Sequence, residues 1–195
     1  INALGEKAQA LRTQPADEIA PAAAADAVRE YLARAARIGE IDGELARRAV
    51  LDPGDSGASN ETLTTELAEL RSRQAATRVQ VEQIIERQVA SVLALEGYTG
   101  VGDQVWPPVS FTFVEPPKKL VVSRRDAIET IYSQMLDAQI SLAEIEQAEE
   151  QIGEQDNAVG YVTDIGGLGA FPTMVVDRAS LRWVLSTVAH EWTHN

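Results

Sequence analysis

The pattern of apolar residues in the first half of the chain predicts helices. Pro21 suits the first turn of a helix, and the apolar residues after it recur every three or four positions: Val28, Tyr31, Leu32, Ala35 and Ile38. Residues 1 to about 58 are rich in alanine, with breaks predicted at Pro15, Pro21, Gly39, Gly43 and 53–57. A shorter helix is therefore predicted over 41–51, and the segment is interpreted as a helical hairpin or small bundle.

A longer helix is predicted over about 60–97. Ser59 or Asn60 can cap its start and Gly97 is a natural end. The stripe between them follows helical spacing through Leu63, Leu67, Leu70, Thr77, Val81, Ile84, Val89 and Val92. It resembles a coiled-coil seam, which indicates self-association through helices as one interpretation. Packing against other helices of the same chain is the favoured interpretation.

Strand formers replace helix formers after 97–102. Residues 109–113 alternate apolar and polar, residues 120–122 are aliphatic, and two prolines stiffen the loop between these predicted strands. A second long helix is predicted to start at the capping sequence Ser123-Arg124-Arg125-Asp126 and to end in the acidic stretch 144–154. Its inward side is predicted to carry Ile128, Ile131, Tyr132, Met135, Leu136, Leu142 and Ile145.

Two more strands, 158–163 and 170–176, are predicted on either side of a glycine-rich turn, 164–169. Pro172 has no N–H for a sheet ladder, so the second of these strands is predicted to lie at a sheet edge. An extended peptide could add to such an edge by main-chain hydrogen bonds, which makes Ala170, Phe171 and Thr173 candidate substrate-binding residues. A plain hairpin with a glycine-rich turn is an equally weighted interpretation.

The last segment, 180–195, predicts an amphipathic helix with two distinct faces. One face carries the aliphatic stripe of Leu181, Val184, Leu185, Val188 and Trp192, and the opposite face carries Trp183 and the two histidines of the chain. Those histidines belong to the sequence His190-Glu191-Trp192-Thr193-His194. Residues four apart stand one above the other on a helix, so both imidazoles are directed to one place with the glutamate alongside.

This H-E-x-x-H pattern on a helix suits a catalytic zinc ion. Two imidazole nitrogens and a third protein ligand can hold the ion, and a water molecule in the open position then has its pKa lowered toward ~7. Glu191 is placed to take the proton of that water as the water attacks a carbonyl. We therefore predict His190 and His194 as metal ligands and Glu191 as the catalytic base. The alternative is a pair of surface histidines on an ordinary amphipathic helix.

Composition narrows the function classes. The chain is 45% hydrophobic and 24% charged, as in globular proteins, and its net charge of −13 argues against a nucleic-acid partner. It has no cysteine, so a zinc site must use nitrogen and oxygen ligands. No stretch approaches the ~20 apolar residues of a membrane span, and no signal peptide is visible. The location stays open, with an extracytoplasmic or membrane-anchored protein slightly favoured.

The order of strand, strand and H-E-x-x-H helix over about 105–195 resembles the zincin metallopeptidases, and 189–195 is similar to a bacterial group of zincin-like proteins. The predicted fold is therefore α+β: the helical pattern predicts a long-helix bundle in 1–98, and the resemblance implies the N-terminal zincin subdomain in 99–195. In that subdomain a small, twisted, mainly antiparallel sheet packs on the H-E-x-x-H helix. It also implies zinc on the two histidines. In the gluzincin branch the third ligand is a glutamate on a later helix, so it is expected after Asn195.

The sequence thus predicts a zinc-dependent peptidase acting on a peptide or protein substrate, of which this chain is an N-terminal portion. Without the rest of the cleft, this portion is expected to bind zinc weakly or not at all and to hydrolyse nothing. Its exposed histidine face, or its helices, are expected to self-associate. The alternative is a non-enzymatic helical scaffold or interaction protein whose H-E-x-x-H motif is accidental or decayed.

Overall fold

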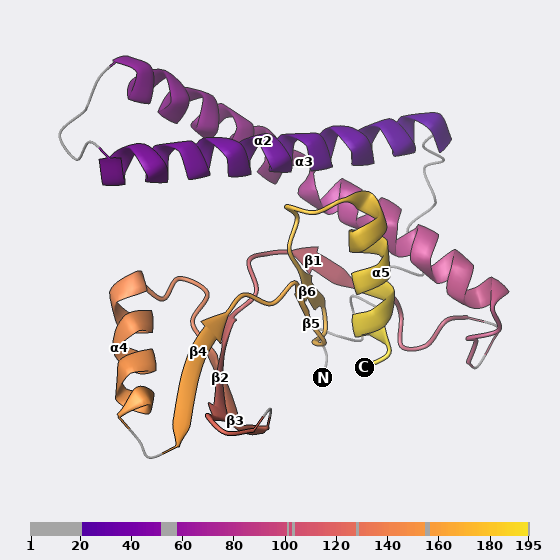
Figure 1. Ribbon diagram of the computed structural model, residues 1–195. Helices are drawn as coiled ribbons and strands as arrows, with labels where there is room; N and C mark the ends of the chain where they lie inside the picture. The colour runs from indigo at the N-terminus through magenta and orange to yellow at the C-terminus, as the bar shows by residue number, and fades with distance from the viewer. Residues whose placement is uncertain are drawn as a thin grey trace.

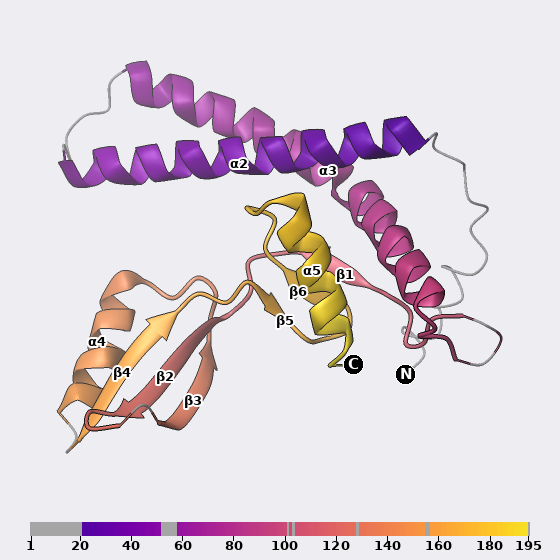
Figure 2. The same ribbon diagram turned by 45° about the vertical axis from the view of Figure 1, so that its right-hand side comes forward.

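The computed structural model describes residues 21–51, 58–100, 102, 104–127, 129–154 and 157–194. Its two longest helices, α2 (Pro21–Leu51) and α3 (Ala58–Leu95), pack on each other (Figures 1 and 2). The predictions made for 1–20 and for the loop at 53–57 lie outside the described residues.

Helix α2 runs without a break, so the predicted interruption at Gly39 and Gly43 is wrong. A glycine inside a helix costs only about 1 kcal/mol, which packing of the helix can offset. Ile41, between the two glycines, is buried, and Asp42 accepts a hydrogen bond from Arg71 of α3 at 2.8 Å. Helix α2 thus continues through both glycines, with a buried side chain and an ion pair to α3 between them.

Three short strands form the first sheet, in the order β1-β6-β5. β1 (Phe111–Phe113) pairs in parallel with β6 (Thr173–Val175), and β5 (Gly167–Leu168) pairs antiparallel with β6. The last helix, α5 (Leu181–Trp192), lies against β5 and β6, while α3 contacts β1 (Figure 1). The sheet thus joins the long helices to the helix that carries both histidines.

The main core is shared by α2, α3, the first sheet and α5. Tyr31 of α2 stacks on Phe113 of β1, with the ring centroids 5.0 Å apart. The buried members of this core are Val28, Tyr31, Val81, Ile84, Ile85, Val89, Val109, Phe111, Phe113, Val175, Val184 and Val188. Val81, Ile84 and Val89 of the α3 stripe are among them. The prediction that this stripe packs against other parts of the same chain is therefore confirmed.

Two buried glutamates of α3 close the outer edge of β1. Glu86 accepts a hydrogen bond from the backbone N–H of Phe111 at 2.9 Å, and Glu82 accepts one from the backbone N–H of Phe113 at 2.7 Å. Because β1 pairs with β6 on its other side, these two N–H groups would otherwise be unpaired inside the protein. An unpaired buried group of this kind costs about 1–3 kcal/mol.

The second sheet is antiparallel, in the order β3-β2-β4. Its central strand β2 (Lys118–Arg124) lies between β3 (Thr130–Leu136) and β4 (Ala158–Thr163), and helix α4 (Leu142–Gly153) packs on β4. Its small core is formed by the buried residues Leu120, Val122 and Ala158, with Leu136, Ile152 and Val162 packed against them. Figures 1 and 2 show this group beside the first sheet and away from α3.

The predicted strands form, but with different partners. Residues 111–113 form β1 and 158–163 coincide with β4, while the predicted strand 120–122 lies inside β2. Neither predicted hairpin exists, because β1 and β2 belong to different sheets, as do β4 and β6. β6 instead pairs antiparallel with β5, inside the segment predicted as a turn. The chain therefore leaves the first sheet after β1, builds the second sheet, and returns to the first at β5.

The long helix predicted from 123 is wrong. Residues 130–136 form β3, because Thr130, Ile131 and Tyr132 favour strands and β2 offers an edge to pair with. The helix begins only at the N-cap Ser141, which forms a capping box with Glu144. Ile128, predicted on the inward side of that helix, lies outside the described residues.

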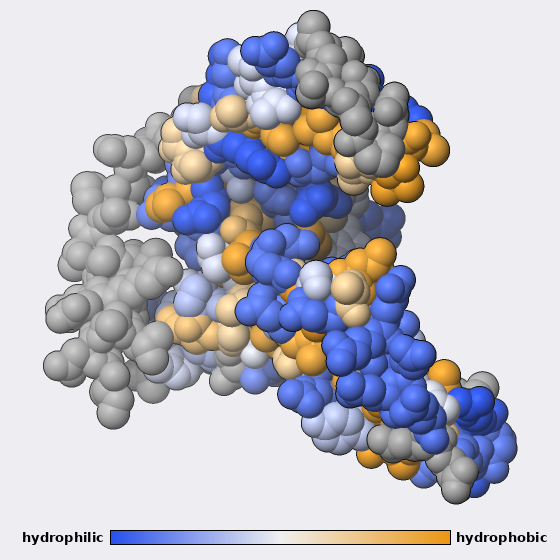
Figure 3. Space-filling model, turned by 90° about the vertical axis from the view of Figure 1, so that its left-hand side faces the viewer, coloured by the Kyte–Doolittle hydropathy of each residue, from blue (hydrophilic) through white to orange (hydrophobic). Residues whose placement is uncertain are grey.

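The predicted α+β fold class is confirmed, with two long helices followed by small sheets in which three of the four strand pairings are antiparallel. None of the helices in the described ranges is both long and apolar enough to span a membrane. The face turned to the viewer in Figure 3, on the side where α4 lies, is mostly hydrophilic with small apolar patches.

Candidate metal centre

Helix α5 is held near both of its ends. The side chain of its N-cap, Ser180, accepts a hydrogen bond from the N–H of Trp183 at 3.3 Å, and Trp192 donates from Nε1 to the carbonyl oxygen of Pro107 at 2.7 Å. Val184 and Val188, between these points, are buried in the main core. Val184 and Val188 of the predicted apolar face therefore pack on the core, whereas Leu181 at the start of that face is 36% exposed. The opposite side is exposed at His190 and His194.

His190 and His194 lie next to each other on that exposed side. Their Nε2 atoms are 3.4 Å apart, and their ring centroids are 5.0 Å apart with an angle of 81° between the planes. Two nitrogens bound to one tetrahedral zinc ion at ~2.0–2.1 Å are about 3.3–3.4 Å from each other. The two imidazoles thus have the separation that a shared zinc ion requires.

Two imidazoles do not complete a catalytic zinc site, which takes a third protein ligand. Within the part of the chain that the structure describes, no group of three or more His, Cys, Asp or Glu side chains could hold a metal ion. The donors present therefore fit zinc as two of its ligands. The third ligand, predicted to come after Asn195, lies outside the described residues.

The glycine-rich segment 166–169 lies directly against the histidine-bearing helix. A Cβ atom added at Gly167 would be 2.6 Å from Cγ2 of Thr187 and 3.1 Å from Cγ of Glu191. Real Cβ atoms essentially never come within 3.0 Å of another heavy atom, so this approach requires glycine. The backbone of β5 therefore packs onto the side chain that the motif predicts as the catalytic base.

The same close approach occurs at the other glycines of the segment. A Cβ atom at Gly169 would be 2.9 Å from Cβ of His194, and one at Gly166 would overlap the ring of Trp183. From the sequence this segment is predicted as a flexible turn, and that interpretation missed its contact with α5. The signal available was the match between three glycines in four positions and a row of side chains, 183, 187, 191 and 194, on one side of the helix.

β6 is the central strand of the first sheet, so the prediction that it lies at an edge is wrong. Pro172 precedes the strand, and its missing N–H therefore leaves the ladder intact. Thr173 is buried and donates its N–H to a carbonyl beside β1 at 2.9 Å, while Ala170 and Phe171 are half-buried ahead of the strand. These three candidate substrate-binding residues offer no strand edge, and the edge near the histidines is that of β5.

A separate cavity of about 260 Å³ lies near the start of α5. Charged side chains around it are Arg71, Arg78, Arg178, Asp42 and Asp177. The buried side chain of Tyr31 also lines this cavity. Burial raises the pKa of Tyr31 above its usual 10.0, and the negative charges of Asp177 and Glu82 raise it further. No residue of the H-E-x-x-H motif lines this cavity, so it is not part of the candidate metal centre.

Comparison of the chain with models of known protein families, with curated proteins and with solved structures finds no match. The candidate metal centre therefore rests on its own geometry: two imidazoles at zinc spacing, a glutamate between them, and a glycine strand packed against that glutamate.

Proposed function

We propose that this protein is a zinc-dependent peptidase in which His190 and His194 bind the metal and Glu191 is the general base. The observation that supports this proposal is the 3.4 Å separation of the two Nε2 atoms. A hydrogen bond donated by N–H is typically shorter, at about 2.7–3.2 Å, whereas the separation fits two nitrogens on one tetrahedral zinc ion. The spacing of the pair is therefore compatible with a shared metal ion.

Zinc bound at such a site polarises a substrate carbonyl and lowers the pKa of a water molecule toward ~7. The task of Glu191 is to accept the proton of that water and to pass it to the leaving nitrogen. Its two carboxylate oxygens lie 3.3 Å and 3.4 Å from the Cβ positions of Gly167 and Gly169, which places the carboxylate across the backbone of β5. Packing against the strand thus restricts the directions that this base can take.

The outer edge of β5, which pairs with no strand among the described residues, gives an extended substrate a place beside this base. β5 is an outer strand of the first sheet and lies against α5. A peptide that adds to this edge by main-chain hydrogen bonds would pass next to Glu191 and the histidines. The proposed substrate-binding segment therefore moves from 170–173 to 166–169.

The test measures zinc content and hydrolysis of a fluorescence-quenched peptide library with the complete protein. Glu191→Gln is expected to keep its zinc and to lose hydrolysis by about 10²–10⁴-fold, because only proton transfer is removed. His190→Ala is expected to lose both zinc and hydrolysis. Glu150→Gln, which changes an exposed glutamate of α4, is the matched control and is expected to alter neither. Zinc retained by His190→Ala, or hydrolysis unchanged in Glu191→Gln, contradicts the proposal.

A further inference from the structure

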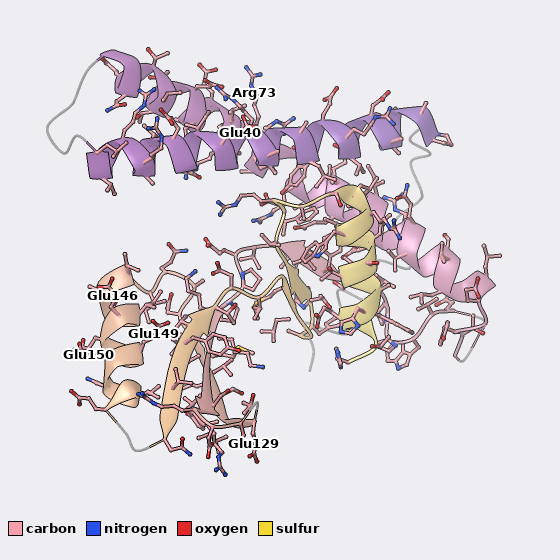
Figure 4. The ribbon with its side chains drawn as sticks, viewed as in Figure 1. Glu40, Arg73, Glu129, Glu146, Glu149 and Glu150 are labelled. Carbon is pink, nitrogen blue, oxygen red and sulfur yellow. The ribbon has the colours of Figure 1, made fainter. Side chains whose placement is uncertain are left out.

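Two of the four sheet edges in the described part of the chain are closed by glutamate side chains. Along β1, Glu82 and Glu86 accept hydrogen bonds from outward N–H groups. Along β4, Glu149 accepts one from the N–H of Val162 at 2.7 Å, and Figure 4 shows Glu149 on the side of α4 that faces this strand. In both cases a helix packs along the strand, and a glutamate of that helix accepts the hydrogen bond from an N–H group that another strand would need.

The edge of β3 has no such cover. Every residue of the strand from Thr130 to Met135 is exposed, and Leu136 is half-buried. Among the described residues, no side chain forms a hydrogen bond with the backbone of β3. In an antiparallel sheet, alternate residues of an edge strand direct their N–H and C=O groups outward, so this edge presents unpaired donors and acceptors.

The composition of β3 lacks the features that usually keep an exposed edge from pairing. Its sequence, Thr-Ile-Tyr-Ser-Gln-Met-Leu, contains no charged residue, no proline and no glycine, although 24% of the chain is charged. Ile131 and Tyr132 are 56% and 54% exposed. The irregularity in its register with β2 falls at one end, between Val122 and Ser123, and leaves the rest of the edge regular. Such an edge is a template for one more strand.

The charged residues near β3 restrict which additional strand could pair with its edge. Glu129 precedes β3 and Asp137 follows it, and the segment 115–164 carries eleven acidic but only four basic residues. The basic residues lie on or next to β2, and two of them form ion pairs, Lys118 with Asp164 and Arg124 with Asp126. Figure 4 shows Glu129 near the second sheet, while Glu146 and Glu150 lie on α4, at the β4 side of the sheet. If β3 of a second copy paired with it in antiparallel fashion, Glu129 of each copy would lie beside Asp137 of the other, and like charges in such a position are destabilising. A strand with basic ends would be attracted instead.

We propose that β3 is a docking strand for an extended segment of a partner protein, which has an uncharged centre and Lys or Arg at its ends. The segment adds to the second sheet in the order partner-β3-β2-β4 and pairs its backbone with the outward groups of β3. Its side chains lie beside Ile131, Tyr132 and Met135, which supply the apolar contacts. This proposal rests on the second sheet and does not depend on the proposed peptidase activity.

The test uses a short fluorescein-labelled peptide of alternating valine and threonine with a lysine at each end, and measures binding to the intact protein by fluorescence anisotropy. Tyr132→Lys places a charge on the open edge and is expected to weaken binding by at least about tenfold. Tyr161→Lys is the matched control, because this tyrosine is 49% exposed but lies in β4, whose edge Glu149 closes. It is expected to change the affinity less than about twofold.

Two further measurements separate the proposal from its rivals. The same peptide with a glutamate at each end is expected to bind at least about tenfold more weakly, and Glu129→Lys is expected to reverse part of that preference. Peptide binding is also expected to slow amide hydrogen exchange in 130–136. Equal loss of binding in Tyr132→Lys and Tyr161→Lys, no binding of the lysine-ended peptide, or a dimer that Tyr132→Lys dissociates in sedimentation experiments, each overturns the proposal.

Discussion

Adding one methyl group to β5 tests whether this strand packs against α5 as closely as the structure shows. In Gly167→Ala the new Cβ would lie 2.6 Å from Cγ2 of Thr187 and 3.1 Å from Cγ of Glu191. In a helix Thr187 has only two favoured χ1 rotamers, so its methyl group can move only by changing rotamer. Either that change or a slight separation of the strand from the helix is required. Overpacking of this kind costs about 1–3 kcal/mol, and the limited freedom of Thr187 places the expected loss at about 2–3 kcal/mol.

Gly43→Ala is the matched control for this prediction. Gly43 is an exposed residue inside α2, and an added Cβ there meets nothing within 4 Å. Alanine favours a helix over glycine, so this variant is expected to gain about 0.5–1 kcal/mol. Urea unfolding followed by tryptophan fluorescence measures both changes, and thermal unfolding should show a Tm lower by roughly 4–10 °C for Gly167→Ala. A Gly167→Ala protein as stable as the wild type would refute the close packing of β5 on α5.

Three single side chains carry the remaining predictions. Because its pKa is raised, Tyr31 is expected to stay protonated well above pH 10.0. The stability that it contributes is therefore present below pH 10.0 and is lost as the pH rises through the higher pKa of the folded protein. Tyrosinate absorbance, compared between the wild type and Tyr31→Phe, measures this, and ionisation of Tyr31 at pH 10.0 would contradict it. Glu82→Ala is expected to lower the free energy of unfolding by about 2–3 kcal/mol, because it leaves a buried N–H of β1 unpaired. The control Glu69→Ala, at an exposed position of α3, should change the free energy of unfolding by less than ~0.5 kcal/mol. Equal effects of the two substitutions in urea unfolding would refute the role of Glu82. Asp126 is expected to titrate at about 2, because hydrogen bonds, chiefly from Arg124, hold its pKa below the usual 3.8. Its contribution to stability is present above pH 3.8 and is lost as the pH falls through 2. NMR titration measures this pKa, and an Asp126 midpoint that Arg124→Gln leaves unchanged would contradict the role of Arg124.

Helix α5 could be predicted from the sequence because its main local signals agree with the packing. Its stripe includes Val184 and Val188, which are buried in the main core, although Leu181 at its start is 36% exposed, and its N-cap, Ser180, forms the expected hydrogen bond. His190 and His194, on the other side, are exposed. The positions of both imidazoles relative to the helix axis follow from the spacing of four residues alone. Only the atomic distance between them required the structure.

The identity of β3 could not be predicted in the same way. Ile131, Tyr132 and Met135 have a spacing that fits one side of a helix, and the same residues also favour strands. What decides between the two is the free edge of β2, which pairs with this segment. The partner strand is set by the fold of the whole chain, so periodicity within the segment cannot reveal it.

The glycine strand beside α5 escaped prediction for a different physical reason. Glycines carry no side chain, so Gly166, Gly167 and Gly169 show neither the period of a strand nor that of a helix. Their role appears only when the helix they contact is in place. Pro172 misled in the opposite sense, because the rule that proline avoids central strands is sound but the strand begins one residue later.

The central claim is that His190 and His194 hold one zinc ion, and X-ray absorption spectroscopy at the zinc edge tests it most directly. In the complete protein loaded with zinc, we expect two imidazole nitrogens at about 2.0–2.1 Å from the metal, with one of them lost in His194→Ala. The account would be contradicted by a protein that binds no zinc. It would also be contradicted by a zinc spectrum that shows no imidazole ligands and is the same in His194→Ala.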